Sequence, residues 1–174
     1  MPFRGKPARG AGLTAGGATT AGAGITHGAT FGEFDAFSRY DRVRYDSPSL
    51  GPITLSVSAG QADRYEGAAR WSQGLGGGQI SAALFYGQQP KVTTWYLKVG
   101  HKWGNNAVSV SYGESEDVIA GFKDKGFQIG FNHNIPKAKV DLYAGVHGNQ
   151  LDTPGAVDVD DIYTVVVGTK LKFD

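Results

Sequence analysis

The feature that most constrains this chain is a two-residue alternation of side-chain character, which runs through most of it from residue 38 onward. In SRYDRVRYDSPSLGPITLSVSAG, residues 38–60, the polar phase holds Arg42, Arg44, Asp46, Thr54, Ser56 and Ser58. The other phase is apolar and holds Val43, Tyr45, Ile53, Leu55 and Val57. Successive side chains of a strand point to opposite faces, so the pattern predicts strands with one apolar and one polar face.

The alternation breaks at clusters of Gly, Asn, Asp and Pro, which is typical of strands separated by turns. No comparable stretch keeps a 3.6-residue apolar stripe, so we expect an all-β fold. The expected strands are about nine in number: 39–47, 52–60, 65–73, 79–88, 93–103, 107–115, 124–135, 139–149 and 161–173.

The connections between these strands alternate in length. Tight ones are SPSLGP, GLGGGQ, WGNNA and IPKAK, whose Gly, Asn and Pro residues suit hairpin turns. The connections between them are mostly longer and more acidic: QADR, GQQPKV, GESEDVIAGFKDK and NQLDTPGAVDVDD. In an antiparallel up-and-down meander every second connection emerges at the same end. We therefore expect one short-turn end and one long-loop end, as in outer-membrane barrels.

Large aromatic side chains of the apolar phase stand near the strand ends: Tyr65, Trp71, Tyr86, Trp95, Trp103, Tyr112, Phe127, Tyr163 and Phe173. In a meander they form two belts around a band of Val, Leu, Ile and Ala, as aromatic rings do at bilayer interfaces. The expected strands, about nine to eleven residues each, can cross a bilayer when tilted. These features favour an antiparallel up-and-down transmembrane β-barrel over a soluble β-sandwich, which would bury its apolar faces.

The polar phase would then line the inside of the barrel. Charged side chains and small hydroxyls are tolerated there only in a wet interior, because a dry one costs several kcal/mol for each unsatisfied group. The sequence therefore predicts a water-filled pore.

Composition excludes several other classes of protein. The 174 residues include no Cys, so a disulfide scaffold and a Cys-ligated zinc site are both excluded. A net charge of +1 gives no argument for nucleic-acid binding. Residues 1–30 are rich in Gly, Ala and Thr and lack the apolar segment of a signal peptide. We expect a low-complexity, disordered leader over 1–30 and a barrel segment over 31–174.

The motifs FDAFSRYDRVRYDSPSLGPITLSVSAG, DRYEGAARWS and DDIYTVVVGTKLKF resemble the C-terminal half of Gram-negative general porins. The similarity extends over residues 31–173. Members of that family are closed barrels of roughly sixteen strands that assemble as trimers. The resemblance implies that this chain is part of such a barrel. If only these strands exist, closure would need a partner chain or a smaller barrel, because open sheet edges cannot face lipid.

The resemblance also implies roles for particular residues. The segment similar to GEFDAFSR leads out of the family's in-folded loop, which would place Glu33 and Asp35 opposite the lumen wall. The Arg-bearing strand that follows lines the constriction, which implicates Arg42 and Arg44. The family's last strand ends in an outward-facing Phe that the barrel-assembly machinery recognises, here Phe173.

The alternation adds Glu66, Arg70 and Lys98 to the same inner face. Together with further lysines they make the lumen net basic, and we expect a mild anion preference. The expected function is an outer-membrane porin that lets ions and small hydrophilic solutes diffuse passively past an Arg-lined constriction. Expected partners are membrane lipid, lipopolysaccharide, the barrel-assembly machinery and two further copies in a homotrimer, with no nucleic acid and no cofactor.

Two other functions stay open. A structural or adhesive barrel would be non-conducting if inward side chains such as Arg70, Phe85, Tyr96 and Tyr143 filled its bore. A soluble β-sandwich could act as a binding module.

No enzyme is expected, because His101 and His133 share the lipid-facing phase without the Ser that a lipid hydrolase needs. No metal site is expected either, because the acidic run at Asp158, Asp160 and Asp161 lacks the spacing of an EF-hand loop.

Overall fold

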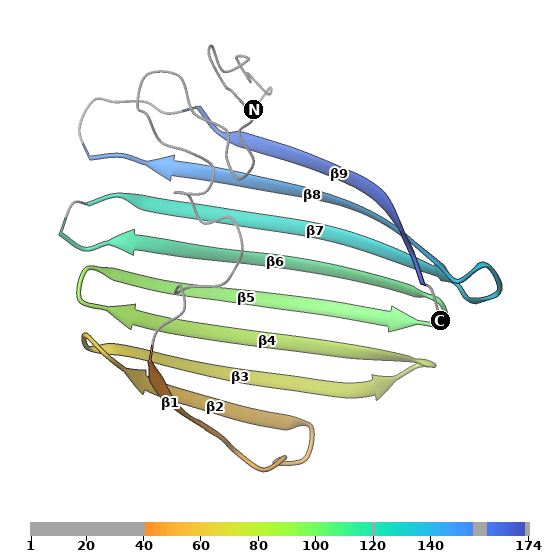
Figure 1. Cartoon of the computed structure of the whole chain (residues 1–174), viewed down its shortest axis with the longest axis horizontal. Helices are drawn as coiled ribbons and strands as arrows, with labels where there is room; N and C mark the ends of the chain where they lie inside the picture. The colour runs from red at the N-terminus through yellow and green to blue at the C-terminus, as the bar shows by residue number, and fades with distance from the viewer. Residues whose placement is uncertain (1–40, 120, 155–159, 173–174) are drawn as a thin grey trace.

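The computed structural model describes residues 41–119, 121–154 and 160–172. Within them one antiparallel sheet forms, and each strand pairs with the next along the chain (Figure 1). Its nine strands are β1 (Arg42–Asp46), β2 (Ile53–Gly60), β3 (Arg64–Leu75), β4 (Gly78–Gln89), β5 (Val92–Trp103), β6 (Asn106–Asp117), β7 (Lys123–Ile135), β8 (Val140–Asp152) and β9 (Ile162–Leu171). The 3-10 turn η2 (Pro136–Ala138) joins β7 to β8. The all-β, up-and-down prediction is confirmed.

The described strands form an open sheet, which corresponds to a segment of a barrel. β1 pairs only with β2 and β9 only with β8, so within the described residues the two ends of the sheet do not meet. No second sheet packs against this one in the described ranges, so the β-sandwich alternative is not supported. The same residues contain no helix that is long and apolar enough to span a membrane.

The strands extend further than the sequence predicted at the expected long-loop end. Gln89 pairs with Val92, so the β4–β5 turn consists of only two residues. Glu116 pairs with Lys123, which leaves a short connection over 118–122. At the other end the β1–β2 connection, 47–52, is longer than either. The predicted contrast between the two ends is therefore only partly correct, because polar residues assigned to loops continue the hydrogen-bonded ladder.

The predicted hairpin turn in GLGGGQ is confirmed, and its glycines explain it. Gly76 and Gly77 form the two-residue turn between β3 and β4, with φ values of 58° and 79°. Positive φ at both central residues is the requirement of a type I′ turn, which matches the twist of the flanking strands.

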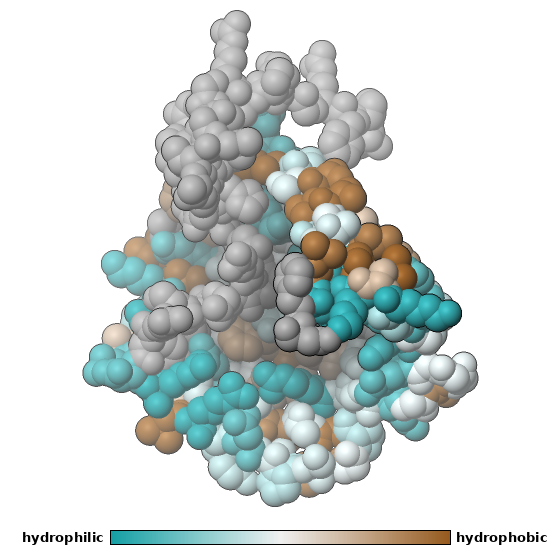
Figure 2. Space-filling view, turned by 45° about the vertical axis from the view of Figure 1, so that its right-hand side comes forward, coloured by the Kyte–Doolittle hydropathy of each residue, from teal (hydrophilic) through white to brown (hydrophobic). Residues whose placement is uncertain are grey.

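The side chains of the apolar phase are exposed on one side of the sheet. Leu55 and Val99 are 43 % and 44 % exposed, and Val165 is 71 % exposed. Small polar side chains of the opposite phase are buried between longer neighbours, including Ser56, Ser58, Thr94 and Ser111. Hydrophobic side chains therefore lie at the molecular surface (Figure 2). This is the reverse of a water-soluble domain and fits a sheet whose outer side meets lipid.

One aromatic belt crosses the outer face as a stepped line. Tyr65 lies on β3, and Tyr86 pairs with Trp95 two positions further along the strands. Tyr112 then pairs with Phe127 after another step of two residues. The rings of Trp95 and Tyr112, on neighbouring strands, have centroids 5.7 Å apart. A belt level with a membrane surface must step in this way when the strands are tilted across the bilayer.

A second belt lies toward the opposite strand ends and includes Trp71 and Trp103. On β5 the residues Trp95 and Trp103 are eight positions apart, which is about 26 Å at roughly 3.3 Å per residue. A tilt of about 40° reduces that span to about 20 Å, comparable with the apolar band of outer-membrane barrels. The two belts thus bound a band of membrane-like height.

Candidate functional site on the polar face

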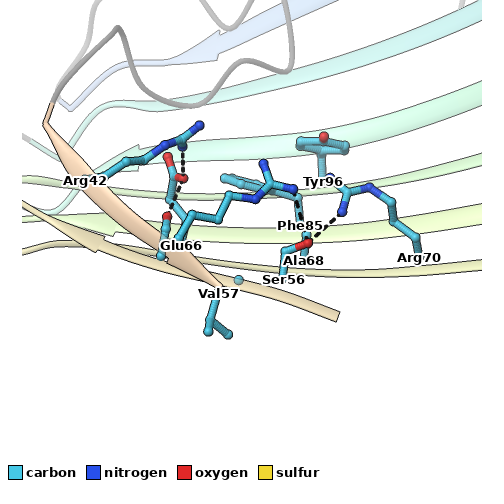
Figure 3. Close-up of a pocket in the computed structure, with 11 residues that line it drawn as sticks. Arg42, Ser56, Val57, Glu66, Ala68, Arg70, Phe85 and Tyr96 are labelled. Carbon is cyan, nitrogen blue, oxygen red and sulfur yellow. Dashed lines mark hydrogen bonds and ion pairs between the residues drawn. The ribbon is translucent and has the colours of Figure 1, made fainter. Parts of the chain in front are cut away.

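Four of the predicted lumen residues lie where β1, β2 and β3 pair: Arg42, Arg44, Glu66 and Arg70. The register places Asp46 opposite Ser56, Arg44 opposite Ser58, and Ser58 opposite Glu66. All of these belong to one phase of the alternation, so their side chains share one face. Figure 3 shows Arg42, Ser56, Glu66 and Arg70 on one side of the ribbon, while Val57 points to the other.

One part of this cluster is an ion pair. The Arg42 guanidinium donates to Glu66 Oε2 at 2.5 Å, and the Ser58 hydroxyl donates to the same oxygen at 2.8 Å. The side chain of Glu66 is only 11 % exposed. This carboxylate is therefore held by two donors, one of them a cation, which fixes its position on the polar face of the sheet.

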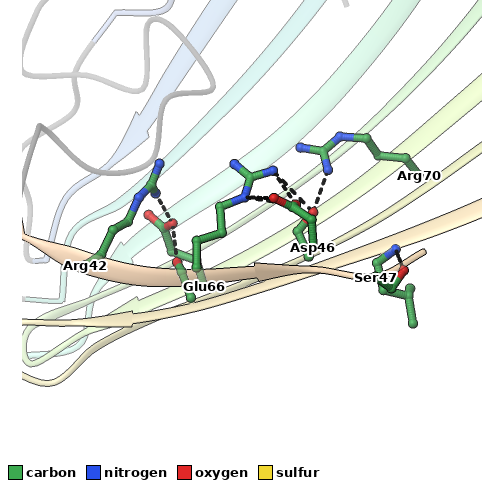
Figure 4. Close-up of polar contacts among 9 residues, drawn as sticks. Arg42, Asp46, Ser47, Glu66 and Arg70 are labelled. Carbon is green, nitrogen blue, oxygen red and sulfur yellow. Dashed lines mark hydrogen bonds and ion pairs between the residues drawn. The ribbon is translucent and has the colours of Figure 1, made fainter. Parts of the chain in front are cut away.

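The other part centres on Ser56. Arg44 donates to Asp46 through Nε and Nη2, at distances of 3.0 and 2.7 Å, and its Nη2 also lies 3.3 Å from Ser56 Oγ (Figure 4). Arg70 reaches the same hydroxyl oxygen from β3, with Nη1 at 2.8 Å. A hydroxyl has two acceptor lone pairs, so one small side chain holds two guanidinium groups side by side.

The cluster carries an excess positive charge. It contains three guanidiniums, from Arg42, Arg44 and Arg70, and two carboxylates, from Asp46 and Glu66, for a sum of +1. Arg42 and Arg44 each have a carboxylate partner. Among the described residues the exposed Arg70 donates one side-chain hydrogen bond, to neutral Ser56, and forms no direct ion pair.

A hollow of about 160 Å³ opens above this cluster. Its lining includes the three arginines, Glu66, the small residue Ala68 and the rings of Phe85 and Tyr96. The two rings stack, with centroids 5.1 Å apart and planes 17° from parallel. The hollow therefore has cations on one side and an aromatic surface on the other.

The structure brings together Arg42, Arg44, Arg70 and Glu66 of the predicted site. Lys98 lies on the same face, but the register separates it from Arg70 by the intervening residue Ala83 of β4. Lys98 is exposed on β5 and does not line the hollow.

Three predicted residues, Glu33, Asp35 and Phe173, fall outside the described residues, so their roles stay predictions. The prediction missed Asp46 as a site residue, although it is two positions after Arg44 and so on the same face.

The two histidines that share the outer face have structural partners. His101 stacks on Trp103 with ring centroids 5.0 Å apart. His133 Nδ1 lies 2.8 Å from Asn106 Oδ1. In the part of the chain that the structure describes, no group of three or more His, Asp or Glu side chains is placed to hold a metal ion.

A family model described as Gram-negative porin matches residues 5–169, which is nearly the whole chain. No curated protein and no solved structure matches. The matched range contains every strand of the described sheet except the last residues of β9, and the sheet has the order and exposed apolar face that a porin wall requires. The chain therefore belongs to the family of Gram-negative porins, channel proteins of the outer membrane.

Proposed function

We propose that the chain forms part of a water-filled pore through which ions and small hydrophilic solutes diffuse passively. The observation that carries the proposal is the inverted arrangement of the sheet: apolar residues are exposed on one face, and ion pairs and hydroxyls occupy the other. A wall of this kind is stable only with hydrocarbon on one side and water on the other.

In this proposal Arg42, Arg44 and Arg70 form the basic wall of the constriction. Solutes that pass such a wall feel a local field, which is strong because the surrounding sheet and lipid have low polarisability. Arg70 contributes most to the net field, since each of the other two guanidiniums faces a carboxylate. Acidic groups on the opposite side, for which Glu33 and Asp35 are the candidates, would make the field transverse.

A mild anion preference follows from the same charges. The wall cluster has a net charge of +1, and Lys98 adds an exposed cation on the same face. Toward the short-turn end Lys172 is offset by Asp141, at 3.0 Å, so that lysine contributes less. The preference should therefore depend on the arginine cluster more than on the lysines near the strand ends.

Reversal potentials across planar lipid bilayers test this proposal. The protein in a KCl gradient should give an anion-to-cation permeability ratio above one, and Arg70→Gln should lower that ratio by roughly twofold. Lys170→Gln, which removes a cation near the barrel end, is the matched control and should leave the ratio almost unchanged. A cation-selective wild type would contradict the proposed charge balance. Inserted, folded protein that never conducts would instead favour the non-conducting structural barrel.

Assembly and location fit the same proposal. We propose that the protein lies in the outer membrane, contacts lipopolysaccharide at its outer rim and assembles as a homotrimer. Phe173 would serve as the signal for the barrel-assembly machinery. A Phe173→Ala variant tests this role and should accumulate outside the membrane fraction. Normal insertion of that variant would remove Phe173 from this role.

A further inference from the structure

Two aromatic side chains occupy the wrong face for a lipid contact. Phe85 and Tyr96 lie on the polar side of β4 and β5, where they stack on each other. The proposed pore does not need them, and an apolar ring in a water-filled bore gives up the stabilisation that burial would provide. Such a ring pair offers a flat π-surface to passing solutes.

The space beside this ring pair is open on the side of the arginines. The residue opposite Phe85 on β3 is Ala68, and the residue opposite Ala68 on β2 is Ser56. Ala68 is too small to fill the gap and is one of the residues that line the hollow of about 160 Å³. A volume of about 150 Å³ is enough to hold a benzene ring.

The far side of the same gap carries the two guanidiniums that share Ser56. Arg70 and Arg44 donate to Ser56 Oγ at 2.8 and 3.3 Å, so both groups lie beside the space over Ala68. A guanidinium has five donors, and the described contacts of Arg70 use one. Its remaining N–H groups can bind a carboxylate with charge-assisted hydrogen bonds.

We propose that this hollow is a binding site for aromatic carboxylates, formed by Phe85, Ala68, Arg70 and Arg44. The ligand's ring stacks on Phe85 above Ala68, and its carboxylate meets Arg70 and Arg44. One monovalent anion also balances the +1 charge of the cluster. The inference rests on the proposed function in one respect, that this face is open to water and solutes.

The ligand class follows from the two halves of the site. Acetate would engage only the guanidiniums, and an uncharged aromatic would engage only the ring. Cyclohexanecarboxylate matches benzoate in charge and approximate size but lacks the π-face, so it isolates the aromatic contact. Such a contact is worth about 0.5–1.5 kcal/mol, or roughly a fivefold difference in Kd.

Binding to the folded full-length chain in detergent micelles is the test, with saturation-transfer NMR and calorimetric titration of benzoate at low salt. Benzoate should bind about fivefold more tightly than cyclohexanecarboxylate. Arg70→Gln should weaken benzoate by about tenfold, because a hydrogen bond to a charged group is lost. Phe85→Leu should remove the advantage of benzoate over cyclohexanecarboxylate and leave the weaker ligand's affinity unchanged.

Two control variants test whether a change in benzoate binding is specific to Arg70 and Phe85. Lys170→Gln removes a polar-face cation elsewhere, and Tyr143→Leu removes a polar-face ring elsewhere; both should bind benzoate as the wild type does. Equal affinity for benzoate in wild type, Arg70→Gln and Phe85→Leu would overturn the inference, as would equal affinity of the wild type for benzoate and acetate. Binding is measured independently of conductance, so the two proposals can fail separately. A protein that conducts but does not bind benzoate contradicts only the binding-site inference. A protein that binds benzoate but does not conduct contradicts only the proposed pore function.

Discussion

Ser56 has one of the smallest side chains on the polar face, yet it connects Arg44 of β1 with Arg70 of β3. The residue is 7 % exposed, and its hydroxyl accepts hydrogen bonds from both guanidiniums. A longer side chain would push the arginines apart, and an apolar one would remove their shared acceptor. The charge arrangement of the wall thus depends on a residue that carries no charge.

Gly148 is the corresponding small residue on the lipid-facing side. It lies between Phe127 and Tyr163 in the pairing of β7, β8 and β9, and the ring of Phe127 lies over it. A Cβ built at this position would be 2.3 Å from the ring carbon Cε1 of Phe127. The glycine therefore provides the space in which that part of the aromatic belt packs, with Phe127 and Tyr163 centroids 6.1 Å apart.

Gly148→Ala should therefore lower the free energy of unfolding by about 1–3 kcal/mol, the usual cost of overpacking, because the Phe127 ring must move away. Urea unfolding in lipid vesicles, followed by Trp fluorescence, measures this. Gly67→Ala is the matched control on β3, since a Cβ there meets nothing within 4 Å. Equal stability of Gly148→Ala and Gly67→Ala would show that Phe127 does not depend on the glycine.

At the residue scale the sequence predicts faces well and contacts poorly. Arg42, Arg44, Glu66 and Arg70 share a face because they share a phase, and the period of a strand leaves no alternative. Which carboxylate each arginine meets depends on the register of β1 against β2, which the turn between them sets. That register could not be predicted from the alternation alone.

At the scale of the single strand, β6 shows how two neighbouring residues meet different environments. Val110 is 51 % exposed on the apolar face and pairs with Ile129 and Val99. The preceding residue, Ser109, belongs to the polar face and pairs with Gly100 and Gly130, which leave space beside it. The two positions have nearly the same depth along the strand but opposite surroundings.

Val110→Arg should destabilise the membrane-embedded protein by about 2–4 kcal/mol, as expected for a cation placed at the lipid midplane. The matched variant Ser109→Arg should cost less than about 1 kcal/mol, because its guanidinium enters water. Reversible unfolding in phospholipid vesicles gives both values. A larger cost for Ser109→Arg than for Val110→Arg would mean that the two faces are assigned the wrong way round.

Strand existence was predictable, and strand ends were not. All nine expected strands form, because their alternation is long and regular. The ends differ where polar residues such as Gln89 and Glu116 continue the pairing. Polarity marks where a strand leaves the apolar band, whereas hydrogen bonding between backbones decides where the strand stops. These are different physical limits. Side-chain polarity can be taken from the sequence, whereas the end of the backbone pairing cannot.

At the scale of the whole molecule, the ends of the described sheet need partners. The outer edges of β1 and β9 have no described neighbour. Each backbone group left unpaired in hydrocarbon costs several kcal/mol, so a membrane-embedded porin must complete its ladder. The partner is either a strand of another chain or, in a smaller barrel, the opposite edge of this same sheet.

Amide hydrogen exchange on the membrane-embedded protein checks this closure. If the ladder is complete, the amides of β1 and β9 should exchange as slowly as those of the central strand β5. Rapid exchange confined to β1 and β9, with β5 protected, would show that the sheet remains open in the membrane.

We propose that the apolar face of this sheet contacts lipid and the polar face contacts water. The chain contains no Cys, so single cysteines can be placed along β5 and spin-labelled one at a time. In lipid vesicles, labels replacing Trp95, Leu97 and Val99 should collide most with oxygen, which concentrates in the bilayer. Labels replacing Thr94, Tyr96 and Lys98 should collide most with a water-soluble nickel complex. Accessibilities in the opposite phase, or with no two-residue period, would contradict the account.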